Sequence, residues 1–309
     1  MQAAFGGIST IWVVIGVGFV IAHLGLVNQA GRRLMSLLAF TVGSPALLFA
    51  LMLRADLADV FSFTVVTSTL AVAAAGAIYL AIALPLFRQS LGDGVIGFMS
   101  SCYTNAANFG LPVALALLHD GTWVAPIMLL QLAVIMPICL TLLDIANNRG
   151  SGVKRHPARY LALPFRNPIT IGILAGLVVN LLGVEVPSVV MQPIDMIAGI
   201  ALPLMLLAFG VSLRLDPLPG KGPHRAPMWI AVVLKVVVHP FAAWAIGTAM
   251  GLAGTDLYAV VILGALPTAQ NVYVTASRYA QGELLARDSV FWSTILSVAS
   301  LLVIAALLG

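Results

Sequence analysis

Long apolar stretches follow one another along the whole chain, and no other feature constrains its fold as strongly. A helix needs roughly 20 mostly apolar residues to cross the hydrocarbon core of a bilayer. Hydrophobic residues make up 61% of the 309 positions and charged residues only 8%, which is too little charge to cover a water-soluble surface. The stretches are continuous and do not alternate with a period of two, which argues against a transmembrane β-barrel. The sequence therefore predicts an all-α integral membrane protein with ten transmembrane helices. The expected spans cover residues 7–27, 34–53, 61–86, 94–118, 122–145, 168–183, 189–213, 228–252, 256–279 and 286–308.

The Lys and Arg residues are distributed unevenly between the connections that join these spans. If the connections are numbered 1 to 9, the odd ones hold 13 of the 15 basic residues, the even ones hold only Arg54, and Lys235 lies inside a span. Because cytoplasmic loops are enriched in Lys and Arg, we expect the odd connections in the cytoplasm and both termini on the outer, periplasmic side of the inner membrane. The net charge of +4 then reflects topology and requires no nucleic-acid partner. The N-terminal run has no preceding basic residue and no cleavage pattern, so it is expected to be a first span and not a signal peptide.

Two halves of five spans each would enter the membrane from opposite sides, and the sequence carries traces of such a repeat. Residues 44–56 and 202–216 each contain a proline, an apolar run and an Arg-x-Asp motif, and the third and eighth spans both contain a proline. We therefore predict a 5+5 inverted repeat, with residues 1–150 as the first half, 151–167 as a basic cytoplasmic linker and 168–309 as the second half. Inverted repeats with interrupted helices in matching positions are typical of secondary transporters.

The fourth and ninth spans each carry amides beside a proline, in "YTNAANFGLPV" (103–113) and "GALPTAQNVYV" (264–274). Proline removes a backbone donor and clashes with the preceding turn, and an unsatisfied backbone group in hydrocarbon costs several kcal/mol. We expect broken helices here, the first one at Pro112, with half-helix N-termini that suit a carboxylate. The alternative is a proline kink whose amides hydrogen-bond neighbouring helices. The candidate substrate-binding residues are Asn105, Asn108, Gly110, Pro112, Pro267, Thr268, Gln270, Asn271, Tyr273 and Lys235.

A few other polar residues fall inside the expected spans. Lys235 and His239 lie four residues apart and so share one helix face. A cation within the membrane is expensive and by default indicates function, so Lys235 is a candidate for anion binding or helix bracing, with snorkelling to the cytoplasmic end as the alternative. His239, Asp195 and Gln131 are candidates for ion coupling. Asp195 lies near the outer end of its span, and helix–helix hydrogen bonding explains Gln131 equally well.

The ten-span arrangement, "TNAANFGLP" in the fourth span, "LPTAQNVYVTASRYAQG" in the ninth and "ALPLMLLAFGVSL" in the seventh resemble the auxin efflux carrier family over essentially the whole chain. That family includes plant auxin exporters and bacterial permeases for malonate or malate. The resemblance implies a scaffold plus a transport domain, like bile acid symporters and Na⁺/H⁺ antiporters, in which spans four and nine cross at Pro112 and Pro267. The chain lacks the long cytoplasmic loop of the long plant exporters, so a short bacterial-type member and a small organic anion are implied, and a homodimer is suggested. The residues carried over from the family's motifs are Asn105, Asn108, Gly110, Pro267, Gln270 and Asn271.

These features favour a secondary carrier that moves a small organic anion, such as a dicarboxylate or an auxin-like carboxylate, by alternating access. The alternative is a Na⁺- or H⁺-coupled symporter or antiporter on the same architecture, which the absence of carboxylates from both break motifs disfavours. A membrane-embedded enzyme is less well supported, because no zinc motif, paired membrane carboxylates or nucleophile–base group occurs. A sensor or structural protein would not explain two interrupted spans. Cys102 and Cys139 indicate neither a disulfide framework nor a metal site. No nucleotide-binding loop is present, and no cofactor is expected.

Overall fold

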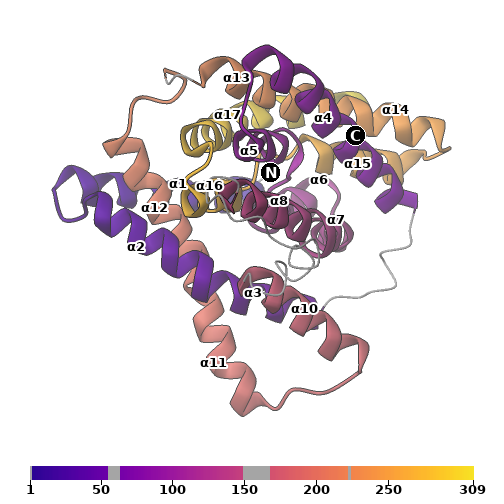
Figure 1. The fold of residues 1–309 in the computed structure, drawn as a ribbon. Helices are drawn as coiled ribbons and strands as arrows, with labels where there is room; N and C mark the ends of the chain where they lie inside the picture. The colour runs from indigo at the N-terminus through magenta and orange to yellow at the C-terminus, as the bar shows by residue number, and fades with distance from the viewer. Residues whose placement is uncertain (1, 55–62, 149–167, 222–223) are drawn as a thin grey trace.

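The computed structural model describes residues 2–54, 63–148, 168–221 and 224–309, and these residues are almost entirely helical (Figure 1). Within them, strand pairing is limited to one isolated bridge. The all-α prediction is therefore confirmed for the described residues, while the predicted linker, 151–167, lies outside them. The α-helices are α1 (Gln2–His23), α2 (Gln29–Leu38), α3 (Ser44–Leu53), α4 (Phe63–Phe87), α5 (Leu91–Cys102), α6 (Leu111–Leu117), α7 (Val124–Leu130), α8 (Met136–Asn148), α10 (Pro168–Leu181), α11 (Ser188–Gly199), α12 (Ala201–Leu215), α13 (Arg225–Val233), α14 (His239–Ala249), α15 (Gly254–Ala265), α16 (Gln270–Tyr279) and α17 (Glu283–Leu308).

Each of the ten ranges expected to span the membrane contains helix. Five continuous helical stretches are long and apolar enough to cross a bilayer, and four further apolar helices in the described part of the chain are shorter. These lengths and compositions fit an integral membrane protein. The five long stretches are Gln29–Leu53, Phe63–Phe87, Ser188–Leu215, Arg225–Ala249 and Glu283–Leu308.

Short π-helical segments explain how several helices tolerate a proline. Proline has no N–H, and its ring clashes with the carbonyl four residues earlier. In each case the π-helix ends two residues before the proline, so the wider turn relieves that clash without ending the helix. The segments and their prolines are Ala39–Gly43 before Pro45, Ala106–Gly110 before Pro112, Gln131–Ile135 before Pro137, and Leu234–Val238 before Pro240.

This pattern overturns the prediction that the fourth span breaks at Pro112. Pro112 lies in the first turn of α6, directly after the π-helix Ala106–Gly110, and the chain is helical on both sides of it. The interruption lies earlier, at Tyr103–Asn105 between α5 and the π-helix. The ninth span does break at its proline, because Leu266–Ala269 separates α15 from α16.

The helices form two groups that pack mostly within themselves. The first helix group comprises α1–α3 and α10–α12, in which α1 packs on α12 and α3 packs on α10 and α11. The second helix group comprises α4–α8 and α13–α17, in which α4 packs on α5 and α14, and α14 packs on α15. In Figure 1 α2, α3, α10, α11 and α12 form the lower and left part, whereas α4, α13, α14, α15 and α17 lie above.

Glycines allow the closest helix contacts in the first helix group. A Cβ atom on Gly210 of α12 would lie 2.0 Å from the backbone oxygen of Ile15 in α1, and one on Gly172 of α10 would lie 2.4 Å from the backbone oxygen of Pro45 in α3. Small residues at helix interfaces are typical of membrane proteins, because they let backbones approach closely. In the first helix group, the backbones of α1 and α12 and those of α3 and α10 therefore lie in close contact.

Candidate functional site

The two interrupted helices meet in a short antiparallel crossing, formed by residues 103–105 and 266–269. Thr104 and Thr268 form the isolated bridge. The Asn105 N–H donates to the Pro267 carbonyl over 2.8 Å, and the Ala269 N–H donates to the Tyr103 carbonyl over 3.2 Å. Each interrupted segment therefore supplies hydrogen-bond partners for backbone groups of the other, which lowers the free-energy cost of interrupting both helices inside the protein.

Side chains from surrounding helices complete the hydrogen bonding of the crossing. The Thr104 N–H donates to Gln131 Oε1 over 3.1 Å, and the Thr268 N–H donates to Ser293 Oγ over 3.0 Å. The Thr268 hydroxyl donates to the Ser100 carbonyl over 2.6 Å. Thr268, a predicted substrate-binding residue, is fully buried, and its hydrogen bonds hold the crossing together. It does not line the cavity described next.

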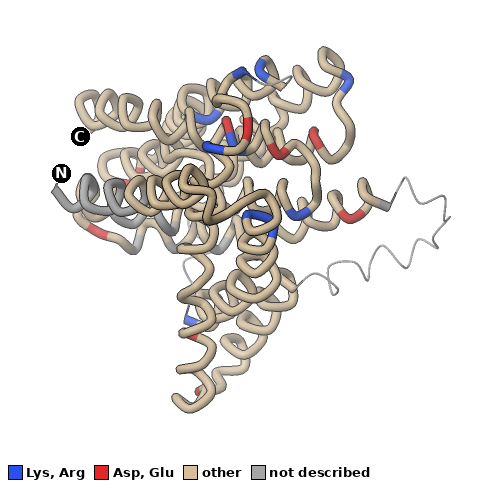
Figure 2. Tube along the Cα trace, turned by 90° about the vertical axis from the view of Figure 1, so that its left-hand side faces the viewer, with Lys and Arg blue, Asp and Glu red and all other residues tan. Residues whose placement is uncertain are grey.

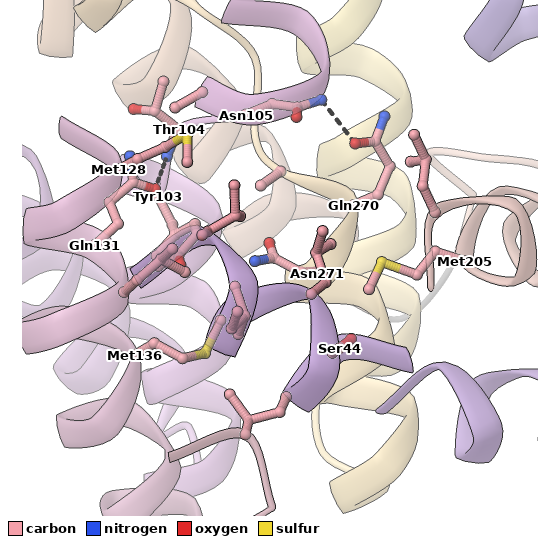
Figure 3. Close-up of a pocket in the computed structure, with 18 residues that line it drawn as sticks. Ser44, Tyr103, Thr104, Asn105, Met128, Gln131, Met136, Met205, Gln270 and Asn271 are labelled. Carbon is pink, nitrogen blue, oxygen red and sulfur yellow. Dashed lines mark hydrogen bonds between the residues drawn. The ribbon is translucent and has the colours of Figure 1, made fainter. Parts of the chain in front are cut away.

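A cavity lies between the crossing and the first helix group, with about 80 Å³ accessible to the centres of water molecules. A volume of about 10–15 Å³ on this measure holds one water, so the cavity has room for a small ligand. Figure 3 shows Asn105, Gln131, Gln270 and Asn271 around it, with the Asn105 amide donating to Gln270 Oε1 over 2.7 Å. The remaining lining residues are Ser44, Leu47, Leu48, Leu51, Tyr103, Thr104, Ala106, Met128, Leu132, Met136, Ile169, Leu202, Met205 and Ala269.

Gln131 lines this cavity and has a side-chain donor without a partner. It begins the π-helix Gln131–Ile135, is only 2% exposed, and uses its Oε1 atom to accept from the Thr104 N–H. Its Nε2 atom is buried and has no hydrogen-bond partner among the described residues. A buried polar atom without a partner costs about 1–3 kcal/mol, so an acceptor in the cavity would recover that free energy.

Helix N-termini face the same cavity. α16 begins at Gln270, its N-cap residue Ala269 offers no side-chain cap, and its first turn contains no acidic residue. The π-helix leading into α6 begins at Ala106, which also lines the cavity. A helix N-terminus carries roughly half a positive elementary charge and free N–H groups, so this end of the crossing attracts an anion.

The C-terminal ends of α5 and α15 instead lie at Lys235. Its Nζ atom lies 2.9 Å from the Gly264 carbonyl, 3.2 Å from Thr104 Oγ1 and 2.8 Å from His239 Nδ1. Three acceptors match the three donors of an ammonium group, with the imidazole accepting when its proton is on Nε2. Lys235 is fully buried and does not line the cavity, so it braces the crossing from the second helix group and compensates the partial negative charge of helix C-termini.

The other predicted site residues lie elsewhere or cannot be placed. Gly110 is buried, donates its N–H to the Asn105 carbonyl over 2.9 Å and does not line the cavity. The side chains of Asn108 and Pro112 lie outside the described part of the structure. Asp195 forms an ion pair of 2.7 Å with Arg54 on the surface.

Tyr273 belongs to a second polar cluster, which joins the two helix groups. Its hydroxyl accepts from Arg32 of α2 over 3.1 Å, and Arg32 forms ion pairs with Asp216 (2.7 Å) and with Glu283 of α17 (3.0 Å). Arg287, buried in α17, lies 3.7 Å from Asp216. Figure 2 shows that charged positions are sparse along the chain and that several red and blue ones lie next to one another. The sequence does not predict this cluster, because Arg residues near the ends of spans are also what the topology of a membrane protein requires.

The described residues form apolar helices, two of which are interrupted and cross beside a cavity lined in part by amides, and this arrangement fits a multi-pass membrane protein. The chain belongs to a family described as membrane transport protein, whose sequence pattern matches residues 4–305. The predicted membership of the auxin efflux carrier family is thereby confirmed.

Three relatives illustrate how broad the family is. A "Putative malonate transporter" of Rhizobium meliloti (strain 1021) is 28% identical over 93% of this chain and 90% of its own length. An "Uncharacterized transporter" of Methanothermobacter thermautotrophicus is 22% identical over 94% of both chains. A "Probable auxin efflux carrier component 1c" of Oryza sativa subsp. japonica is 24% identical over 47% of this chain and 25% of its own length.

Proposed function

We propose that the protein is a secondary carrier that moves a small organic anion, such as a dicarboxylate or an auxin-like carboxylate, across the inner membrane by alternating access. The observation that carries this proposal is that Gln131, which lines the cavity and keeps its Nε2 donor unpaired, lies with the N-terminus of α16 around the same cavity. Together these groups offer an anion both hydrogen-bond donors and partial positive charge. The names of two relatives, a malonate transporter and an auxin efflux carrier, agree with a carboxylate substrate.

The proposal includes ten spans in a 5+5 inverted repeat, with both termini on the periplasmic side and residues 1–150 and 168–309 as the two halves. Matching contacts support it. The packing of α1 on α12 corresponds to that of α10 on α3, and the packing of α4 on α5 corresponds to that of α14 on α15. Alternating access would move the second helix group, which holds the crossing, against the first. The ion pairs and hydrogen bonds around Arg32 would then break and re-form during the transport cycle, because they join the two helix groups.

The cation-coupled alternative is less well supported. A coupling Na⁺ would use oxygen ligands at the broken helices, yet Thr104 Oγ1 and the Gly264 carbonyl already contact Lys235. The described residues contain no group of three or more His, Cys, Asp or Glu that could hold a metal ion. Membership of a transporter family also argues against an enzyme or a sensor. Proton coupling through His239 remains the second candidate, because its ring contacts Lys235 over 2.8 Å.

The test is counterflow of radiolabelled malonate, malate and indole-acetate into liposomes that contain the purified protein, with protein-free liposomes subtracted. Gln131→Glu keeps an oxygen that accepts from the Thr104 N–H, but it replaces the cavity donor with a negative charge. One hydrogen bond to a charged group contributes about 1.5–3 kcal/mol, so we expect substrate affinity to fall at least tenfold. The matched control is Gln192→Glu, at an exposed position of α11.

Saturable counterflow whose apparent substrate affinity falls at least tenfold in Gln131→Glu and is unchanged in Gln192→Glu would support the proposal. Unchanged counterflow in a folded Gln131→Glu variant would remove Gln131 from the binding site. If folded wild-type protein showed no counterflow with any of the carboxylates, the organic-anion assignment would be wrong.

A further inference from the structure

A lysine without a carboxylate partner lies inside the second helix group. Lys235 is fully buried, and none of the ion pairs between described residues includes it. A charge within the membrane is costly and by default indicates function. Because burial disfavours the charged form, buried lysines often serve as proton donors and acceptors. Lys235 is therefore a candidate to bind and release a proton.

The helices around Lys235 bring no counter-charge to it. The π-helix Leu234–Val238 that carries it packs against α4, α5, α13, α15 and α17, and α14 follows it. Among the described groups, the Cys102 thiol at the C-terminal end of α5 and the His239 ring interact with Lys235. The other titratable groups of these helices are engaged elsewhere or exposed: Tyr79 with Gln89, Asp93 at the cap of α5, Tyr258 beside Gly309, Glu283, Arg287 and Asp288 in the cluster around Arg32, and Arg225 and Asp256 at the surface.

The hydrogen bonds of Lys235 can be kept when one proton is lost. The ammonium group faces the Gly264 carbonyl (2.9 Å), Thr104 Oγ1 (3.2 Å) and His239 Nδ1 (2.8 Å). A neutral amine has two donors and one lone pair, and a neutral imidazole has one donor and one acceptor. The amine can donate to the first two groups and accept from His239 once the imidazole proton is on Nδ1. Loss of one proton from the pair therefore costs none of these three contacts.

Two small cavities lead from His239 towards one end of the second helix group. The inner cavity is lined by His239 and by Ser68 of α4. The outer cavity has about 10 Å³ accessible to the centres of water molecules, which is room for about one water. Its lining includes Thr64 and Trp123, which are partly exposed. The two cavities adjoin, because both are lined by Ser68, Ile127, Val260 and Leu263.

Ser68 is placed to pass a proton between a water in the outer cavity and the His239 ring. It is the one polar side chain among the described residues that line both cavities. The inner cavity is too small to hold a water, whereas a hydroxyl group both donates and accepts. The outer cavity lies beside the 3₁₀-helix Gly121–Trp123, in a connection that is on the outer side in the proposed topology.

We infer that Lys235 and His239 form a proton-binding pair, which exchanges one proton with the outer side through Ser68 and whose charge strengthens anion binding. On release, the ammonium proton passes to His239 Nδ1 while the Nε2 proton leaves towards Ser68, and uptake reverses both transfers. Proton binding stands apart from the proposed function, whereas its effect on the anion rests on that function. Thr104 links the two sites, because it contacts Lys235 and lines the anion cavity. The pair is positive at low pH, so acid favours the anion.

Nitrogen-15 NMR of the lysine side chains tests proton binding without any anion. The chain contains three lysines, Lys154, Lys221 and Lys235, and the Lys154→Arg and Lys221→Arg variants identify the other two signals. In the full-length protein in lipid nanodiscs, we expect the Lys235 signal to change from that of an ammonium group to that of an amine as the pH rises to about 9. The signal of Lys221, which is exposed, should remain that of an ammonium group, because ordinary lysines titrate at about pH 10.4.

The route is tested by the rate at which the Lys235 protons exchange with water. Ser68→Val removes the hydroxyl and fills space between the two cavities. Because a positioned proton-transfer group contributes about 10²–10⁴-fold in rate, exchange should slow at least about tenfold. The matched control is Thr69→Val, at the next position of α4 and outside both cavity linings, which should leave the exchange rate unchanged.

The same NMR titration in saturating malonate tests the effect of the pair on the anion. If protonation strengthens anion binding tenfold, then by reciprocity the anion strengthens proton binding tenfold. The Lys235 transition should therefore move up by at least about one pH unit. The transition in malonate is compared with the transition in an equal concentration of chloride.

Each outcome decides part of the inference. A Lys235 signal that is still that of an ammonium group at about pH 9 would overturn the proton-binding pair and leave the anion carrier intact. Equal exchange rates in folded Ser68→Val and Thr69→Val protein would remove Ser68 from the route. An unchanged transition in malonate, in protein that performs malonate counterflow, would overturn the effect on the anion. If no carboxylate is transported, the proposed function fails, and the titration without malonate still decides whether the pair binds a proton.

Discussion

Replacing Lys235 with methionine should weaken the crossing and stop transport. The methionine keeps the apolar stem but removes the donor that serves the Gly264 carbonyl and Thr104 Oγ1, at 2.9 and 3.2 Å. Each buried acceptor left without a donor costs about 1–3 kcal/mol, so the two together amount to about 2–6 kcal/mol. Relief of the desolvation of a buried ion works in the opposite direction, but three contacts to acceptors offset that penalty in the wild type.

The measurement is the melting temperature of the purified protein, followed by gel filtration, together with anion counterflow. A loss of 2–6 kcal/mol at roughly 2–4 °C per kcal/mol predicts a decrease of at least about 4 °C. Lys221→Met, at an exposed position, is the control and should melt like the wild type. Lys235→Met protein that melts and transports like the wild type would refute the reasoning that an ammonium group holds the two helix C-termini together.

Two further predictions concern the contacts that hold the helix groups. Arg32→Gln breaks buried ion pairs and should lower the free energy of unfolding by about 3–5 kcal/mol. Arg54→Gln removes a side chain that is 57% exposed and should change this free energy by at most about 1 kcal/mol. Chemical denaturation measures both values, and equal losses in the two variants would contradict the prediction. Gly210→Ala places a Cβ atom 2.0 Å from the Ile15 backbone oxygen and should sharply reduce the yield of folded protein, whereas Gly199→Ala has open space and should not. Fluorescence-detected gel filtration compares the two, and normal yield of Gly210→Ala would exclude the close contact between α1 and α12.

Much of the fold is readable from the sequence because membrane helices require long apolar runs. The ten expected ranges contain helix, and the second break falls at Leu266–Ala269, around the expected Pro267. The first break could not be read from proline chemistry. A π-helix accommodates Pro112, and the chain instead opens at Tyr103–Asn105, where no residue is itself a helix breaker. Hydrogen bonds to residues 267–269 stabilise that interruption, and the local sequence around Tyr103–Asn105 does not encode them.

The site itself was predicted in part. The amides Asn105, Gln270 and Asn271 meet at one cavity, as the paired motifs indicated. The alternative that Gln131 bonds a neighbouring helix agrees with the structure, in which its Oε1 atom accepts from the Thr104 N–H, while its Nε2 donor stays unpaired among the described residues. The apolar side chains of the cavity lining come mostly from α3, α7, α8, α10 and α12, which lie outside the two motifs, so neither motif could reveal them.

The antiparallel crossing explains how so few charged residues could serve an anion carrier. Two helices that break while running in opposite directions bring like ends together, so the C-termini of α5 and α15 lie at Lys235 and the N-terminus of α16 lies at the cavity. The backbone itself then supplies a positive pole and a negative pole inside an apolar protein. A buried lysine stabilises the negative pole, and in the proposed carrier neutral amides would orient the anion at the positive one. In the proposed carrier, a basic side chain in the cavity would bind the anion more tightly in every state of the transport cycle. Such uniform binding would slow release of the anion and would not speed turnover.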